Sequence, residues 1–142
     1  MTTIAEVRAD LANVLSAIPG WSVANLNGTP LGYIGDQLNT YSFKVGRPAF
    51  DPRMVFSQAK AQHTFTVTAY APRTPAEQSE AALDALCELT GEGSLIATVQ
   101  DGTNWSVTVD YAVVTNCGEV QVATWIDGVE YLACQFQIEV VW

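Results

Sequence analysis

Residues 131–142 read YLACQFQIEVVW, and their side chains alternate between apolar and polar over the length of one long strand. One face of this strand would carry Leu132, Cys134, Phe136, Ile138, Val140 and Trp142. The other face would carry Tyr131, Gln135, Gln137 and Glu139. A strand with one apolar face packs that face on the core. We therefore expect a half-buried strand whose second face meets water or a polar partner.

Three other stretches predict strands. Residues 62–69 alternate in the same way, and residues 105–113 place Trp, Val, Val, Tyr and Val at alternate positions. Residues 120–126 predict a third strand, and Asp127-Gly128 after them is typical of a two-residue hairpin turn. We expect the last three strands, 105–113, 120–126 and 131–142, to form an antiparallel meander.

Two helices are predicted by their N-terminal signals. Thr3 and Glu6 have the spacing of a capping box, and apolar residues then recur at helical spacing up to Pro19-Gly20. Thr74 and Glu77 repeat that spacing, with proline at the first helical position. The apolar stripe of this second helix would be Leu83, Leu86, Cys87 and Leu89, with Gly91 as its C-terminal cap. Residues 94–100 favour a short helix over a strand.

The segment from 29 to 61 lacks clean periodicity and contains several Gly and Pro residues. It predicts a long loop or arm, with a short strand at about 41–45 and another before it at 21–26. Loops of this length are more often functional than idle. The element order predicts a single α+β domain over residues 1–142. We expect a mainly antiparallel or mixed sheet flanked by two helices, with the arm between the first helix and the central strands.

Charge is distributed unevenly along the chain. There are 15 acidic and 6 basic residues, for a net charge of -9, and no Lys or Arg occurs after Arg73. Proteins that bind duplex DNA neutralise its phosphates with Lys and Arg, so conventional DNA binding is not expected of the C-terminal half. We expect no membrane association, because no stretch has the roughly 20 apolar residues of a membrane helix.

The sequence has no recognisable catalytic or metal motif. Cys87, Cys117 and Cys134 fit neither a zinc pattern nor a disulfide framework, and we interpret them as buried free thiols. His63 is the only histidine, and a lone histidine within a strand is usually structural. We expect a protein that is not an enzyme and has no cofactor and no metal. A small ligand-binding or enzymatic domain, with a pocket between the sheet and the arm, is the alternative from another class.

A row of carboxylates marks the second predicted helix. Glu77, Glu80, Asp84 and Glu88 are spaced to share one face, with no lysine between them. The face is either ordinary solvated surface or a surface that must stay acidic, to meet a basic partner or to repel nucleic acid. Both interpretations stay open at this point.

Four of the six bases lie between residues 44 and 60, among prolines and aromatic residues. Arg, Met and aromatic residues are enriched in interface cores, so we interpret this segment as a contact to another subunit or partner. The candidate interface residues are Lys44, Arg47, Phe50, Asp51, Arg53, Met54 and Phe56. The alternative is a loop folded over the sheet, with Phe50 and Phe56 in the core and Arg53 paired with Asp51.

An ordered series of short stretches carries a resemblance to a known family. The stretches are 35–38 (GDQL), 45–57 (VGRPAFDPRMVFS), 67–74 (VTAYAPRT), 109–112 (VDYA), 128–133 (GVEYLA) and 139–142 (EVVW). Together they span nearly the whole chain, although none is as diagnostic as a P-loop. In this series the chain resembles the tail terminator, or tail completion, proteins of long-tailed bacteriophages, particularly those that infect actinobacteria.

The resemblance implies a non-enzymatic virion protein with no catalytic residues. It implies a hexameric ring of this chain at the head-proximal end of the tail tube, formed in the host cytoplasm during assembly. The ring would stop tube polymerisation, contact the major tail tube protein and join the head-completion (neck) proteins. Viral DNA would pass through without specific binding. A head-completion or stopper protein of the neck is the closest alternative.

Overall fold

The structure is a computed structural model that describes residues 2–23, 41–46, 55–56, 60–73, 76–124 and 130–142. The first part of the chain forms α1 (Ile4–Ser16), β1 (Ser22–Val23), β2 (Ser42–Val45), β3 (Val55–Phe56) and β4 (Lys60–Pro72). The remainder forms α2 (Ala76–Leu86), α3 (Leu95–Gln100), a 3-10 turn η2 (Gly102–Asn104), β5 (Tyr111–Cys117), β6 (Gln121–Thr124) and β7 (Glu130–Val141).

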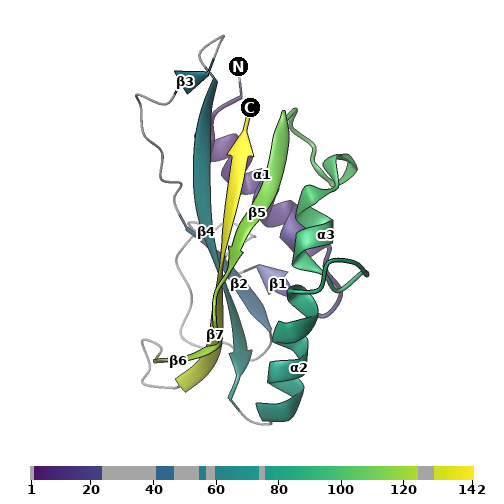
Figure 1. The fold of residues 1–142 in the computed structure, drawn as a ribbon, viewed down its shortest axis with the longest axis vertical. Coiled ribbons are helices and arrows are strands. Elements are labelled where there is room, and N and C mark those ends of the chain that lie inside the picture. Colours follow the sequence, from purple (N-terminus) through teal and green to yellow (C-terminus); the bar gives the residue numbers. More distant parts are fainter. Residues whose placement is uncertain (1, 24–40, 47–54, 57–59, 74–75, 125–129) are drawn as a thin grey trace.

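The described strands form one mixed sheet with the helices on the same side of it (Figure 1). The strand order is β1-β2-β4-β7-β5, with β3 added to β4 and β6 added to β7. Only β1 and β2 pair in parallel, and the other pairs are antiparallel. The α+β class and the mainly antiparallel sheet with flanking helices are therefore confirmed.

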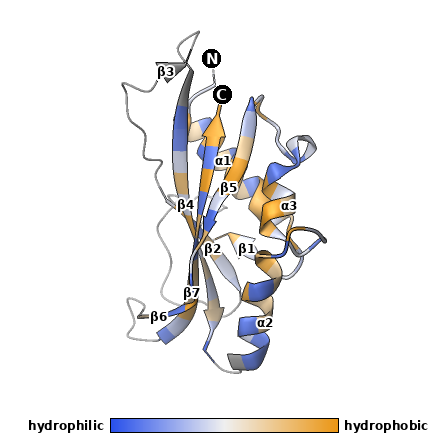
Figure 2. Cartoon of the chain, viewed as in Figure 1, coloured by the Kyte–Doolittle hydropathy of each residue, from blue (hydrophilic) through white to orange (hydrophobic). Residues whose placement is uncertain are grey.

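Strands β4 and β7 form the centre of the sheet, paired without interruption from Gln62↔Val141 to Pro72↔Tyr131. Alternate residues of both strands face the helices and are fully buried, including Phe65 and Val67 on β4 and Phe136 and Ile138 on β7. They pack against buried side chains of α1, α2 and α3, among them Leu11, Leu83 and Leu95. Figure 2 shows the apolar and polar bands that alternate along these strands. The alternation predicted for 131–142 is confirmed, except that Tyr131, expected on the polar face, is buried.

The predicted capping box at the start of α1 is present. The Thr3 hydroxyl accepts a hydrogen bond from the Glu6 amide at 3.2 Å, and the Glu6 carboxylate accepts one from the Thr3 amide at 3.1 Å. Each bond satisfies an amide at the helix start that has no partner within the helix. The helix ends at Ser16, and Gly20 then adopts a φ of 82°, a left-handed conformation that glycine enters without strain.

The strand predicted over 105–113 is wrong in its first half. Residues 102–104 form a 3-10 turn, and β5 begins only at Tyr111. The Trp105 indole N–H donates to the Val99 carbonyl at 2.9 Å, and the Asp10 carboxylate accepts from the amides of Ser106 and Val107 at 2.8 and 3.1 Å. These tertiary bonds hold residues 105–107 against the helices instead of in the sheet.

Strands β5, β6 and β7 do not form the predicted meander. Both β5 and β6 pair with β7, β5 with its C-terminal half and β6 with its N-terminal half. Strands β5 and β6 are therefore two pieces of one outer strand, which is interrupted over residues 118–120. At the break the Gly118 amide donates to the Gln135 carbonyl at 2.7 Å, and a Cβ at Gly118 would lie 3.1 Å from that oxygen. The expected turn at Asp127-Gly128 lies outside the described residues.

Helix α2 is shorter than predicted. It ends at Leu86, so Leu89 is not part of its apolar stripe and is 75% exposed. Gly91, with a φ of 106°, belongs to the turn between α2 and α3 and does not directly cap α2. The short helix favoured for 94–100 is confirmed as α3, which Ser94 caps by accepting from the Ala97 amide at 3.0 Å.

The segment from 29 to 61 is described only in part. The short strand expected at 41–45 is confirmed as β2, and β1 lies within the stretch 21–26. Two features were not predicted, β3 and the start of β4 at Lys60. Residues 24–40, 47–54 and 57–59 lie outside the description, as do Thr74 and Pro75. In the part of the chain that is described, none of the helices combines the length and apolar character needed to span a bilayer.

Candidate interaction surfaces

The acidic residues predicted on the second helix are all exposed. Glu77, Glu80 and Asp84 lie on α2, and Glu88 follows two residues after its end. The predicted row is therefore three helical carboxylates and a fourth in the following turn. Helix α2 stands at one end of the helix layer (Figure 1). This end of the molecule therefore exposes negative charge. No Lys or Arg follows Arg73 in the sequence to offset it.

Of the predicted basic interface, the structure places only Lys44 and the backbone of Phe56. Lys44 lies on β2 opposite Thr68 of β4 and is half-buried. Phe56 lies on β3, where it pairs with Lys60. The other candidates, Arg47, Phe50, Asp51, Arg53 and Met54, lie outside the described residues. Two other bases have defined roles, since Arg8 donates to the Val45 carbonyl at 2.8 Å and Arg73 pairs with Glu130.

The sheet face away from the helices carries a ladder of polar side chains along its two central strands. Thr64, Thr66 and Thr68 of β4 are half-buried and pair across the sheet with Glu139, Gln137 and Gln135 of β7. The intervening residues of both strands point into the core, so this ladder lies on the opposite face. The polar second face predicted for 131–142 is confirmed at Gln135, Gln137 and Glu139.

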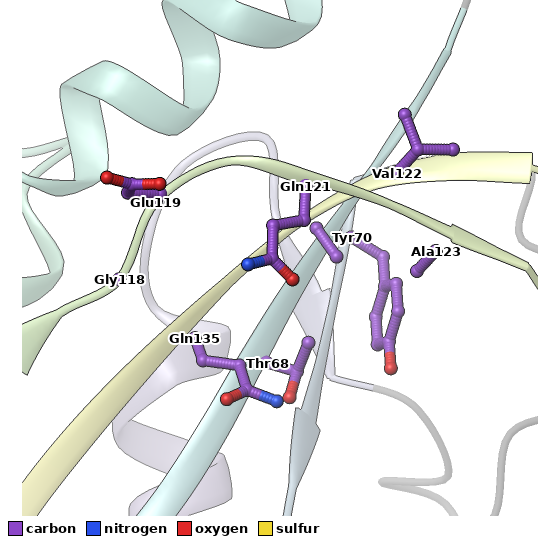
Figure 3. Close-up of a pocket in the computed structure, with 9 residues that line it drawn as sticks. Thr68, Tyr70, Gly118, Glu119, Gln121, Val122, Ala123 and Gln135 are labelled. Atoms are coloured by element: carbon purple, nitrogen blue, oxygen red, sulfur yellow. The ribbon is translucent and has the colours of Figure 1, made fainter.

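A first hollow, the β6 pocket, opens on this polar face beside the break between β5 and β6 (Figure 3). Its lining includes Thr68, Tyr70, Glu119, Gln121, Val122 and Gln135. In Figure 3 the side chains of Thr68 and Gln135 lie together, and Gln121 extends over them. The volume is about 170 Å³, below the roughly 300–1,000 Å³ of ordinary small-molecule sites. The pocket suits one polar side chain and not a whole cofactor.

The environment of Tyr70 agrees with a partly enclosed pocket. Burial raises the pKa of its phenol above the ordinary value, and a hydrogen bond with Thr68 opposes that effect. The phenol is therefore neutral at physiological pH and acts as a hydrogen-bonding group.

A second hollow, the β5 groove, lies between α3 and η2 on one side and the outer edge of β5 on the other. Its volume is about 420 Å³, and it is lined by Gln100, Trp105, Val109, Asp110, Tyr111 and Val113 together with neighbouring backbone. Tyr111 and Val113 pair with Val141 and Glu139 of β7, so their side chains, 40% and 38% exposed, lie on the sheet face away from the helices. Sequence reasoning missed the groove, because the same alternating residues were assigned to a strand with a buried face.

One carboxylate lines the β5 groove, and a second is next to a lining residue in the sequence. Asp110 is part of the lining, and Asp101 immediately precedes the lining residue Gly102. On the sheet face away from the helices, the Tyr111 hydroxyl donates to the Glu139 carboxylate at 3.0 Å. Hydrogen bonds from Thr103 hold the pKa of Asp101 below its usual value, so it is ionised at neutral pH. The groove therefore combines apolar side chains, such as Trp105 and Val109, with the carboxylate of Asp110.

The three cysteines gather where α2, β5 and β7 meet. Cys134 is buried, Cys87 and Cys117 are half-buried, and the Cys87 thiol is hydrogen-bonded to both others. Burial, with the neighbouring thiols, raises the pKa of Cys117 to about 11 and that of Cys134 to about 12. Thiols with such values hold their protons at neutral pH and are poor nucleophiles. The interpretation as free thiols is confirmed, with full burial only at Cys134.

The remaining candidate for chemistry, His63, is part of the core. Its ring is 6% exposed and stacks on Trp142 with 4.2 Å between ring centroids. The Trp142 indole in turn donates to the Thr2 carbonyl at 3.2 Å, which joins the two ends of the chain. Within the described ranges, no three His, Cys, Asp or Glu side chains are grouped as metal ligands.

Comparison with known proteins identifies no family for this chain. No family model matches the sequence, and no curated protein matches it significantly.

Proposed function

We propose that this chain is a tail terminator: a non-enzymatic virion protein that forms a hexameric ring on the head-proximal end of a phage tail tube. The ring stops tube polymerisation and joins the tail to the head-completion proteins. The proposal starts from the ordered series of sequence stretches that resemble this family.

The observation that carries the proposal is the separation of charge within one chain. The exposed carboxylates of α2 and Asp110 in the β5 groove belong to a half of the chain without Lys or Arg after Arg73. The bases are concentrated between residues 44 and 60. A closed ring needs a heterologous interface, in which two different patches of each subunit meet. Oppositely charged patches on one chain are suited to such a contact.

The excess of negative charge agrees with a DNA conduit. In a ring of six copies, each with a net charge of -9, a bore lined by part of that negative charge repels phosphate. A basic protein binds a duplex because its Lys and Arg neutralise phosphates and release counterions. A negatively charged surface does not do this, so DNA passes it without being bound.

The test is the assembly state with and without tail tubes. Size-exclusion chromatography with light scattering should find a hexamer in solution or on tubes, and tubes capped by the protein should stop growing. A strict monomer that leaves tube growth unchanged contradicts the proposal. Binding to DNA-filled heads without any binding to tubes would instead identify a head-completion protein.

Charge reversal in the basic segment separates assembly from folding. We expect Arg47→Glu and Arg53→Glu to weaken ring assembly about tenfold or more, as loss of an interfacial charge pair does. The midpoint of thermal unfolding should change little. If both variants lose thermal stability as severely as assembly, the segment has a structural role in its own subunit.

A further inference from the structure

We propose that the cysteine cluster, formed by Cys87, Cys117 and Cys134, is an oxidation site at which a low-molecular-weight disulfide, such as oxidised glutathione, joins Cys87 to Cys117. The product is a disulfide bond between the end of α2 and the end of β5. The inference goes beyond the proposed function and does not depend on it, since it needs only one folded copy of the chain and an oxidant.

The three thiols of the cluster come from separate elements and meet on one side of the sheet. Cys87 follows α2 directly, Cys117 is the last residue of β5, and Cys134 lies on β7. Cys117 pairs with Phe136, whose fully buried side chain faces the helices, and Cys134 is two residues from Phe136 on the same face. The Cys87 thiol, at the end of a helix on that side, is hydrogen-bonded to both.

The strand register excludes one of the three possible bonds. Because Cys117 is opposite Phe136, it is a diagonal neighbour of Cys134 across the sheet. Diagonal neighbours lie roughly 7–8 Å apart, slightly less between their Cβ atoms. A disulfide needs Cβ atoms about 3.5–4.5 Å apart. Cys117 and Cys134 therefore cannot be joined without moving the strands, so Cys87 must be one partner of any bond.

The environment of Cys134 favours Cys117 as the other partner. Cys134 is 1% exposed, and its thiol donates to the Gly118 carbonyl at 3.1 Å. A bond to Cys134 would remove its only thiol hydrogen, and the hydrogen bond to Gly118 would be lost with it. Cys87 and Cys117 are half-buried, so a small oxidant can approach both. Only the bond between these two keeps the contact of Cys134 with Gly118.

The reaction is ordinary thiol–disulfide exchange in two steps. The Cys87 thiolate attacks one sulfur of oxidised glutathione, which forms a mixed disulfide and releases one glutathione thiolate. The Cys117 thiolate then attacks the Cys87 sulfur and releases the second glutathione thiolate. Each released thiolate takes up a proton, and each attacking cysteine has lost one. Two cysteine thiols are thus oxidised while one glutathione disulfide is reduced to two thiols.

The second step is slow near neutral pH. Burial is the main cause that raises the pKa of Cys117 to about 11, so only a small fraction of this thiol is ionised at pH 7. The nearby Cys87 and Cys134 thiols oppose its ionisation too. The cluster therefore stays reduced in a reducing compartment and is oxidised only by sustained exposure to an oxidant.

The bond would constrain the outer strand at its break. Strand β5 ends at Cys117, and the interruption between β5 and β6 begins at Gly118, beside the β6 pocket. A bond from Cys87 closes residues 87–117 into a loop and restricts the unfolded chain, which stabilises the folded state. We expect the midpoint of thermal unfolding to rise by roughly 5–10 °C on oxidation.

The decisive experiment maps the bond in the full-length chain. The protein is incubated with excess oxidised glutathione at mildly alkaline pH, its free thiols are alkylated in denaturant, and it is digested with pepsin in acid, where disulfides do not exchange. Mass spectrometry should find the peptide of Cys87 joined to that of Cys117, with Cys134 alkylated. The oxidised protein should migrate as a monomer on a non-reducing gel.

Each other result of the mapping overturns the inference. A bond that includes Cys134 shows that the register and the contact with Gly118 do not select the pair. A bond between two copies places the oxidation site between subunits. Three thiols that stay reduced, or that carry glutathione alone, show that Cys117 does not complete the exchange.

Matched substitutions separate the bond from ordinary effects on stability. Each variant is compared with itself, oxidised against reduced with dithiothreitol, so any loss of stability from the substitution is common to both measurements. We expect Cys134→Ala to keep the rise of roughly 5–10 °C and Cys117→Ala to show none. A rise that survives in Cys117→Ala, or that is lost in Cys134→Ala, contradicts the assignment.

The two proposals fail separately. A chain that forms the bond but leaves tail tubes uncapped contradicts only the tail-terminator function. Tubes capped by a protein whose thiols resist oxidation contradict only the oxidation site.

Discussion

Strand β7 has a different kind of neighbour on each side. Strand β4 pairs with it continuously from residue 62 to residue 72, and its core-facing side chains from Phe65 to Ala71 are completely buried. The neighbour on the other side is broken into β5 and β6, and it exposes Val113 and Val122. The β6 pocket and the β5 groove both border this broken strand.

The two neighbours of β7 differ in what they contribute: the β4 side contributes to stability and the β5–β6 side to binding. A continuous pair of central strands, covered by helices on one face, buries apolar area. An interrupted outer strand leaves backbone and apolar side chains exposed to a partner. We expect substitutions on the β4 side to act on folding and substitutions on the β5–β6 side to act on association.

The largest effect should come from the central pair. Phe65→Ala removes a fully buried ring from β4 and should lower the free energy of unfolding by about 3–5 kcal/mol, measured in urea. The matched change on the outer strand, Val122→Ala, should stay within about 0.5 kcal/mol because the side chain is already exposed. Similar losses for both would remove the distinction between the two neighbours of β7.

Asp10 connects α1 to the segment that leads into β5, and its loss should have the next largest effect. Asp10→Ala leaves the amides of Ser106 and Val107 without their acceptor and should cost about 1.5–3 kcal/mol in urea unfolding. Asp10→Asn keeps an acceptor oxygen and should recover part of that stability. If alanine and asparagine are equally harmful, these hydrogen bonds are not the source of the effect.

We expect the backbone at the break between β5 and β6 to require a residue without a side chain at position 118. In Gly118→Ala the new Cβ would lie 3.1 Å from the Gln135 carbonyl oxygen, and the strain should cost about 1–3 kcal/mol. Gly102→Ala is the control, because nothing lies within 4 Å of its Cβ position, and its stability should change by less than about 0.5 kcal/mol. Equal unfolding midpoints for both variants would show that the break tolerates a side chain.

The smallest effect concerns the thiols, at high pH. Burial raises the pKa of Cys117 to about 11 and that of Cys134 to about 12, from 9.0 in the unfolded chain. The folded state therefore binds these protons more tightly, so their contribution to stability is complete below pH 9 and is lost as the pH rises through the folded values. Urea unfolding at pH 7 and pH 10 should show a smaller alkaline loss in Cys134→Ala than in the parent chain. An identical loss in both contradicts a contribution from Cys134.

The elements that could be predicted are those specified by local signals. The capping box of Thr3 and Glu6 and the period-two pattern of 131–142 depend on residues close together in sequence, and both are present. The exposure of the carboxylates on α2 follows in the same way from helical spacing. Gly91 was misassigned because a glycine after an apolar stripe suits either a helix cap or a later turn.

What the sequence alone determined is the α+β class, the two long strands at the centre, and the unequal distribution of charge. Only the tertiary structure decided that residues 105–107 leave the sheet and that β5 and β6 share one edge. The reason is physical: Asp10 reaches Ser106 and Val107 across nearly a hundred residues, and Gly118 meets Gln135 on another strand. No local pattern encodes bonds between such distant residues, which lie beside the β5 groove at residues 105–107 and beside the β6 pocket at Gly118.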